Sequence, residues 1–453
     1  MRIANSVLLD ITISGRHYIM SLNYIIDSLL QTLNRSELSK RIARGAFWSF
    51  SGTAMAKFLI LLSGILLAHI LERKEYGEFG MIRSTINMFV VFGVAGLGVT
   101  ATKYISEYRD NYIERIPSIY ILTNGFSHIT GLLVVSMVLV FSTQIAISLD
   151  SPHLSDEIKI GAILLYFTIL IGTQNGVLAG FEDFKSIAVN GFWGAVAESV
   201  FLLLGAFFYG VIGAIFGFGT GFIVQYYLNK RTINKIFKKK GIHISSAGIR
   251  KEDFKLLYKF SLPAALSSFM TAPAFWITRA FLIKQSGFEE LAIYEAADQW
   301  KVIILFIPTA VGQIVLPILS SISKTKDEFV KVLHVNLLMN IAVTFTLSIF
   351  VLFLGRSIMS LYGKDYMEGS VLTILTFSTI FTSVASVVGM SIYSRGKVWV
   401  GFTFNLIWSL LFILISYYLV SIGYGAEGLA IGLFVAYFIH SSCQYIYLRF
   451  SLK

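Results

Sequence analysis

The segment Asn229-Lys-Arg-Thr-Ile-Asn-Lys-Ile-Phe-Lys-Lys-Lys240 divides the chain in two, because its six basic residues interrupt a largely apolar sequence. Windows of about 20 apolar residues, long enough to cross the hydrocarbon core of a bilayer, occur about six times before it and about six times after it. The 453 residues have a mean hydropathy of +0.72, and only 14% are charged, whereas soluble domains carry about 25% charged residues. The sequence therefore predicts an all-α integral membrane protein with about 12 transmembrane helices.

The spans are predicted at residues 46–70, 79–101, 118–141, 160–180, 187–208, 210–229, 260–283, 293–315, 333–354, 371–393, 398–420 and 426–447. Tyr209-Gly210 is the shortest link and predicts a tight hairpin. We expect two pseudo-symmetric six-helix bundles at residues 45–229 and 260–448, joined by a basic cytoplasmic linker at 230–259, with a cytoplasmic tail at 449–453.

The first 44 residues are expected to form a cytoplasmic N-terminal tail. Within it, Met20–Leu33 is interpreted as an amphipathic surface helix. A natural start at Met20, with the first 19 residues a translation artefact, stays open as an alternative.

Lysine and arginine are distributed unevenly between the two sides of the membrane. With the N-terminus inside, six of the 37 basic residues fall in outside loops and four fall within spans, which leaves 27 inside. Such an excess is typical of cytoplasmic loops. The sequence thus predicts a multi-pass cell membrane protein with cytoplasmic N- and C-termini. The basic segment is interpreted as an orientation signal that touches anionic headgroups, with docking of a partner as the alternative.

Short similarities between the two halves indicate an internal duplication. The second span begins with Gly77-Glu-Phe79 and carries Arg83 four residues later, while the eighth begins with Ala292-Ile-Tyr294 and carries Asp298 four residues later. Repeats in a membrane protein favour a transporter, with its substrate site between the repeats.

Four basic residues, Lys57, Arg83, Arg279 and Lys301, fall within predicted spans. A cation at the bilayer centre costs roughly 2.5–3.5 kcal/mol on insertion scales, so each is expected to face a polar cavity. Lys57 is near the midplane, too deep for its side chain to reach the interface. Because Arg and Lys suit phosphate oxygens, we expect the four to line a cavity for an anion. For Arg83 and Arg279, reaching the outer surface is the alternative.

Two acidic residues accompany these cations. Asp298 and Lys301 are spaced i,i+3 on one helical face, so a self-contained ion pair is the alternative to a binding role. Glu198 lies near the middle of the fifth span, where we expect it to neutralise a cation or carry a proton. A secondary polar lining is predicted from Asn124, His128, Gln174, Asn175 and Tyr294, the first four of which are otherwise explained as interhelical hydrogen-bond partners.

Several functional classes are disfavoured by composition. Cys443 is the single cysteine, which excludes an internal disulfide framework. The seven histidines are scattered without metal-ligand spacing, so neither a metal nor another cofactor is expected. The net charge of +11 is explained by membrane topology, and nucleic acid is not an expected partner.

Four segments resemble the Wzx-like polysaccharide flippases of the multidrug/oligosaccharidyl-lipid/polysaccharide (MOP) exporter superfamily. They are Arg44-Gly-Ala-Phe-Trp48, Leu71-Glu-Arg-Lys-Glu-Tyr-Gly77, Gly180-Phe-Glu-Asp-Phe-Lys185 and Pro317-Ile-Leu-Ser320, and their order and spacing carry the resemblance. Many members have Asp-Arg in the seventh span, where this chain has Thr278-Arg279, so an ion-coupling role for that acid is in doubt here.

The resemblance implies a V-shaped pair of bundles that exposes a central cavity to each side of the membrane in turn. Its cargo would be a polyprenyl-diphosphate-linked oligosaccharide, whose diphosphate the four cations would hold. Glycosyltransferases or a polymerase of the same pathway are the expected partners, besides the bilayer. A MATE-type cation-coupled multidrug antiporter is the alternative, and a membrane glycosyltransferase or polymerase is less favoured because no external loop exceeds about 20 residues. We therefore expect a transporter and not an enzyme.

Overall fold

The computed structural model describes residues 37–94, 96–244, 254, 269–309, 326–395 and 397–452. This part of the chain is helical and contains no strand, which confirms the all-α prediction. The α-helices are α2 (Glu37–Ile70), α3 (Arg73–Val94), α4 (Leu97–Tyr108), α5 (Ile116–Ser148), α6 (Ser155–Gly180), α7 (Phe184–Lys240), α10 (Thr271–Ser286), α11 (Phe288–Ile304), α13 (Lys326–Met359), α14 (Ser370–Ser394), α15 (Val398–Leu419) and α16 (Gly425–Ser451). The expected helix at Met20–Leu33 lies outside the described residues.

Seven helical stretches of the described residues are long and apolar enough to cross a membrane, or eight if the bent pair of α3 and α4 counts as one span. Two of the seven, Phe184–Lys240 with 57 residues and Trp399–Ser451 with 53, are long enough for two spans each. The helix α7 continues to Lys240, so residues 230–240 of the expected linker are helical.

Both double-length stretches reverse at glycines. In α7 the helical backbone is interrupted at Tyr209 and Gly210, where Gly210 has φ +57°, in agreement with the predicted hairpin. Between α15 and α16, Gly423 and Gly425 have φ +94° and +47°. Glycine adopts these angles without the steric cost that a Cβ atom brings. The fifth and sixth spans of each half are therefore joined in the same way.

The predicted second span, 79–101, is two helices in the structure. The break falls at Gly96, which has φ +70° and precedes α4, and α3 and α4 are bent by 44° relative to each other. A continuous apolar run does not reveal such a bend, because glycine is also tolerated in straight membrane helices.

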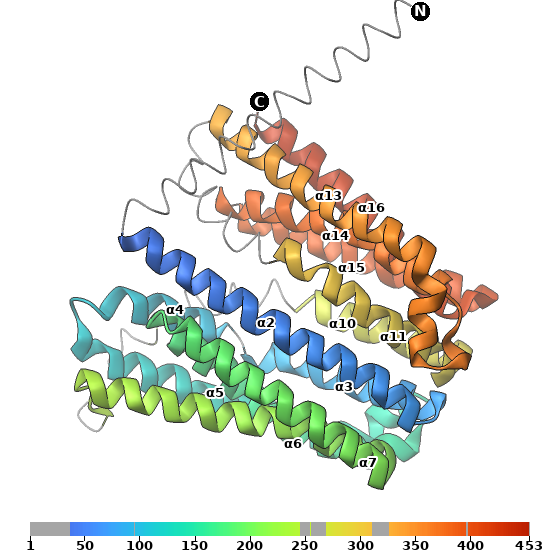
Figure 1. Cartoon of the computed structure of the whole chain (residues 1–453), viewed down its shortest axis with the longest axis horizontal. Coiled ribbons are helices and arrows are strands. Elements are labelled where there is room, and N and C mark those ends of the chain that lie inside the picture. Colours follow the sequence, from blue (N-terminus) through green and yellow to red (C-terminus); the bar gives the residue numbers. More distant parts are fainter. Residues whose placement is uncertain are drawn as a thin grey trace, which may run out of the picture.

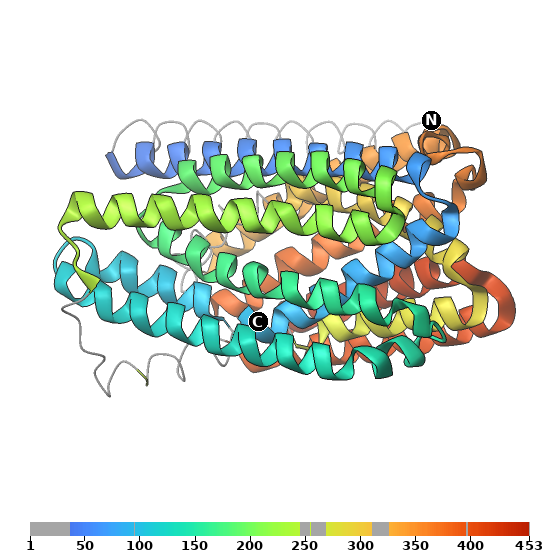
Figure 2. The same cartoon turned by 90° about the horizontal axis from the view of Figure 1, so that it is seen from below.

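Helices α2–α7 form one half and α10–α16 the other, and the halves lie side by side (Figure 1). All run along the same long axis of the molecule (Figure 2). We call the end at which α2 ends at Ile70 and α10 meets α11 at Gly287 the outer end, because the charge pattern predicts it to be extracellular. The opposite end, where α7 ends at Lys240, is the inner end. The helices of the two halves converge at the outer end and diverge toward the inner end (Figure 1).

The two halves meet chiefly through α3 and α11. Glycines permit this close contact: a Cβ atom on Gly77 would lie 2.1 Å from the carbonyl oxygen of Phe288, and one on Gly80 would lie 2.6 Å from the Cγ of Glu295. Behind this contact the rings of Tyr76 and Tyr366 lie 6.0 Å apart in an edge-on arrangement. We call the contact between α3 and α11 at the outer end the outer seam.

Arg73 adds a polar fastening at the rim of the outer seam. Its Nε donates to the carbonyl oxygen of Glu289 over 3.1 Å, and its Nη1 donates to the carbonyl oxygen of Asp365 over 3.0 Å. One side chain of the N-terminal half thus binds two separate segments of the C-terminal half.

Candidate functional site

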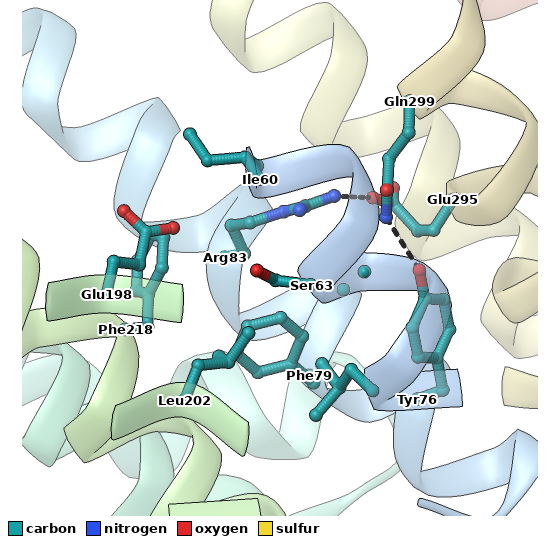
Figure 3. Close-up of a pocket in the computed structure, with 13 residues that line it drawn as sticks. Ile60, Ser63, Tyr76, Phe79, Arg83, Glu198, Leu202, Phe218, Glu295 and Gln299 are labelled. Atoms are coloured by element: carbon teal, nitrogen blue, oxygen red, sulfur yellow. Dashed lines mark hydrogen bonds and ion pairs between the residues drawn. The ribbon is translucent and has the colours of Figure 1, made fainter. Parts of the chain in front are cut away.

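A single carboxylate joins the two halves inside the bundle. Arg83 of α3 donates from Nη2 to Glu295 Oε2 over 2.7 Å, and Arg279 of α10 donates from Nε to Glu295 Oε1 over 2.6 Å. The side chains of Glu295 and Arg279 are only 3% and 8% exposed. Figure 3 shows the guanidinium of Arg83 pointing toward Glu295. Each guanidinium therefore has an acidic partner, as a buried ion requires, although the two share one negative charge.

The network continues along α11 and α10. Asp298 Oδ2 lies 3.6 Å from Arg279 Nη2, and Asp298 also forms an ion pair with Lys301. This i,i+3 pair is the one that the sequence anticipated. The ring of Phe275 lies beneath both cations, 5.7 Å from the Arg279 guanidinium carbon and 5.3 Å from Lys301 Nζ, so ring and charge attract each other.

Three of the four cations expected at the site are thus brought together, and neither arginine reaches out to the surface. Sequence reasoning missed Glu295, which adds a third intramembrane acid to Glu198 and Asp298. The predicted eighth span begins at Ile293, only two residues before Glu295, whereas α11 begins at Phe288 and places Glu295 well within the helix. The spacing of Glu295, Asp298 and Lys301, three residues apart on one helical face, is the signal that could have revealed it.

Lys57 is not part of this network. It lines a separate cavity of about 330 Å³ between α2, α6 and both arms of α7, together with Glu198, Asn175 and Gln225. Within the described part of the chain, Lys57 and Glu198 have no ion pair and no hydrogen bond. The cavity lies toward the inner end, because its lining includes Asn175 near the inner end of α6 and Ile187 near the inner end of α7.

A second cavity, of about 20 Å³, lies further toward the outer end (Figure 3). Its polar lining includes Arg83, Glu198, Glu295 and Gln299, and its volume suffices for about one water molecule. Glu198 lines both cavities, on the opposite side of Arg83 from Glu295 (Figure 3). In the lining of the small cavity, Gln299 Nε2 also donates to the hydroxyl of Tyr76 over 2.6 Å, where the outer seam begins.

The secondary polar residues are spread over several helices. His128 Nδ1 lies 2.6 Å from the Tyr166 hydroxyl, and Asn175 Oδ1 accepts a hydrogen bond from Asn229 Nδ2 over 3.0 Å. These two residues link helices in the manner of ordinary interhelical partners.

The remaining three differ from them. Asn124 is half-buried on α5. Gln174 Oε1 and the Tyr294 hydroxyl are buried without a hydrogen-bond partner among the described residues. Tyr294 lies within the network itself, since its ring centre is 5.1 Å from the Arg279 guanidinium carbon.

Among the residues that the structure describes, no group of three or more His, Cys, Asp or Glu side chains is placed to hold a metal ion.

The sequences that match this chain are all described in terms of polysaccharide biosynthesis, polysaccharide export or O-antigen transport. Residues 42–323 match the family model described as polysaccharide biosynthesis protein. The chain is 25% identical to the EPS I polysaccharide export inner membrane protein EpsE of Ralstonia nicotianae, over 41% of this chain and 44% of that protein. It is 26% identical to the capsular polysaccharide biosynthesis protein CapF of Staphylococcus aureus, over 88% and 96% of the two chains. A putative O-antigen transporter of Shigella flexneri is 25% identical over 79% of this chain and 85% of its own.

The chain therefore spans less than half of EpsE but nearly the whole of CapF. Among solved structures, the inward-facing conformation of a multidrug resistance MATE family transporter of the MOP superfamily matches with a TM-score of 0.78. The match has 14% sequence identity and covers 90% of this chain and 98% of the other. At that identity the likeness is one of fold, and it confirms the predicted MOP-type architecture.

Proposed function

Because the chain belongs to the polysaccharide biosynthesis protein family and has the fold of MOP superfamily transporters, we propose that it exports a polysaccharide precursor. In finer terms, it moves a polyprenyl-diphosphate-linked oligosaccharide from the inner to the outer leaflet of the cell membrane. Such a headgroup needs a carrier, because sugars and phosphates cannot enter hydrocarbon without losing their hydrogen bonds to water. Glycosyltransferases supply this substrate on the inner side, and a polymerase or ligase consumes it outside.

The observation that carries the proposal is the bridge from Arg83 through Glu295 to Arg279. It lies where the two halves touch, and it joins the second span of one half to the seventh and eighth spans of the other. A carrier that opens to each side in turn must have a contact between its halves that the cargo can weaken. A carboxylate shared by two guanidinium groups is such a contact when the cargo is itself an anion.

The diphosphate acts by competition. Its oxygens bind guanidinium groups in the same bidentate manner as a carboxylate does. When a diphosphate that enters from the inner end takes Arg83 and Arg279, Glu295 loses its partners and the outer seam loses its central fastening. The ligand thereby favours the outward-open state, and it can do so only to the extent that it binds that state more tightly. Lys301, held by Asp298, maintains the positive balance of the site.

The multidrug antiporter is the rival, and Glu198 favours it. A carboxylate that lines a cavity without an ion-pair partner could bind a cationic drug or a coupling cation. The two functions differ in the ligand that stabilises the folded protein, because a ligand that binds only the native state raises its unfolding temperature.

The deciding experiment uses the full-length protein in proteoliposomes. The substrate is the lipid-linked oligosaccharide fraction extracted from cells that lack this protein, and its arrival in the opposite leaflet is measured by lectin accessibility. We expect protein-dependent transfer of this fraction, and a rise in unfolding temperature with it but not with ethidium. Stabilisation by ethidium alone, without transfer of the oligosaccharide, would assign the protein to the antiporters.

A further inference from the structure

The cavity around Lys57 has an unusual lining. Three side chains from different helical segments face it: Lys57 from α2, Glu198 from the first arm of α7 and Gln225 from the second. None of the three forms an ion pair or a hydrogen bond among the described residues. Asn175 also lines the cavity. Its amide oxygen accepts a hydrogen bond from Asn229 Nδ2. At about 330 Å³ the cavity falls within the roughly 300–1,000 Å³ typical of ligand pockets.

These three side chains are half-buried, so water that enters the cavity reaches them. A ligand that replaces this water must supply hydrogen bonds of its own, because a donor or acceptor left without a partner costs about 1–3 kcal/mol, and a charged group more. By contrast, Arg83, Arg279 and Lys301 each form an ion pair with an acidic side chain. The contrast indicates that Lys57, Glu198 and Gln225 are arranged for water and for a polar ligand that replaces it.

The donor and acceptor set identifies the class of ligand. Lys57 only donates, an ionised Glu198 only accepts, and the amides of Asn175 and Gln225 do both. Sugar hydroxyls donate and accept at once, so a pyranose can satisfy all four groups. A diphosphate only accepts hydrogen bonds, so it could bind Lys57 but would leave the ionised Glu198 carboxylate without a donor. A prenyl chain would leave every one of these groups unpaired.

We infer that this cavity is the sugar subsite of the transporter and holds the glycan residue attached directly to the diphosphate. The inference rests on the proposed function. Its position supports this order, since Glu198 and Ile60 line both this cavity and the small one that contains Arg83. A sugar beside Glu198 therefore places its diphosphate next to the bridge of Arg83, Glu295 and Arg279.

Gly191 provides a way to fill the cavity without disturbing the fold. A Cβ atom at this position would meet only Gln225 Nε2, at 3.7 Å, within a 4 Å radius. By contrast, a Cβ atom on Gly52, which also lines the cavity, would lie 2.4 Å from the Cβ of Ala188 and would force the helices apart. Gly191→Leu is therefore the steric test of sugar entry.

The experiment is cysteine protection in the full chain. Cys443, the single cysteine, is replaced by serine, and Thr53, an exposed residue of the cavity lining, is replaced by cysteine. The rate of labelling by a soluble thiol reagent is measured with three probes. These are the intact lipid-linked oligosaccharide from cells that lack this protein, its oligosaccharide released by mild acid, and undecaprenyl diphosphate without sugar.

We expect the intact substrate and the released oligosaccharide to protect Thr53→Cys, and undecaprenyl diphosphate to leave it reactive. Glu198→Gln and Lys57→Gln should each raise the oligosaccharide concentration for half-protection on the order of tenfold, since each replaces a charged hydrogen-bond partner by a neutral and weaker one. Gly191→Leu should abolish protection. Lys230→Gln, on an exposed face of α7 outside this cavity, is the charge-matched control, and Asn234→Cys is the position that no probe protects.

Equal protection by undecaprenyl diphosphate and by the intact substrate would contradict the sugar subsite, because the cavity would then bind the lipid or its phosphates and not the sugar. Failure of both sugar-bearing probes would overturn it as well. Neither result touches the proposed function as long as the proteoliposomes still transfer the oligosaccharide. Loss of transfer by the unmodified protein would reject the function itself.

Discussion

Glu295 and Arg83 lie 212 residues apart in the sequence, yet the Arg83 Nη2 atom is 2.7 Å from a Glu295 carboxylate oxygen. The other oxygen of the same carboxylate binds Arg279, 16 residues away and within its own half. Glu295 is therefore a member of the C-terminal half that also holds the N-terminal half.

This double role predicts unequal effects of neutralising the two partners. Glu295→Gln leaves two guanidinium groups without a full counter-charge, whereas Arg83→Gln leaves Glu295 paired with Arg279. Breaking a buried pair costs about 3–5 kcal/mol. We expect the unfolding temperature in nanodiscs to fall clearly more for Glu295→Gln than for Arg83→Gln, while both lose export. Equal stability of the two variants would contradict the shared bridge.

Asp298 and Lys301 permit a double-mutant test. Lys301→Gln leaves Asp298 beside Arg279, 3.6 Å away, whereas Asp298→Asn leaves Lys301 without its counter-charge. Asp298→Asn should therefore destabilise the protein more than Lys301→Gln does. The double variant should recover part of the loss, because residues in one ion-pair network couple. Thermal unfolding of the three variants checks this, and strictly additive effects would show that the two residues do not interact.

Lys57→Ala and Arg279→Ala separate binding from stability. Both are expected to impair display of the surface glycan while the protein still inserts into the membrane. Only Arg279→Ala should lower the unfolding temperature markedly, because it strips Glu295 of a partner, while Lys57 has none to lose among the described residues. Normal glycan display from Arg279→Ala would contradict the proposed anion site, and normal display from Lys57→Ala would contradict a binding role for the separate cavity that Lys57 lines.

Gly77 tests the outer seam. A Cβ atom there would lie 2.1 Å from the Phe288 carbonyl oxygen, so Gly77→Ala must separate α3 from α11. Overpacking of this kind costs typically 1–3 kcal/mol, all of it in the state that is closed at the outer end. We expect a cysteine at position 76 to become reactive to an impermeant thiol reagent applied from outside. Gly125→Ala is the control, because nothing lies within 4 Å of a Cβ atom at that glycine.

The sequence predicted those features that depend on local periodicity. Apolar windows placed the helices, Tyr209-Gly210 marked a hairpin that the structure contains, and the i,i+3 spacing of Asp298 and Lys301 anticipated their pair. The Glu295–Arg83 contact could not be predicted from the sequence, because it depends on how the two halves pack. The cavity that Lys57 lines could not be predicted either, because the sequence indicates how deep a residue lies in a helix but not which neighbours that side of the helix faces.

The outer seam also bears on the voltage across the cell membrane. Each elementary charge that crosses a potential of 100 mV releases about 2.3 kcal/mol. A carrier with a cavity large enough for a sugar would therefore dissipate ion gradients if a continuous path of water crossed it. Gly77 brings α3 flush against the Phe288 carbonyl, and Tyr76, Tyr362 and Tyr366 pack behind it. In the proposed transporter, whose inner end the charge pattern predicts to face the cell interior, this packing closes the outer end to ions while the cavity is open at the inner end.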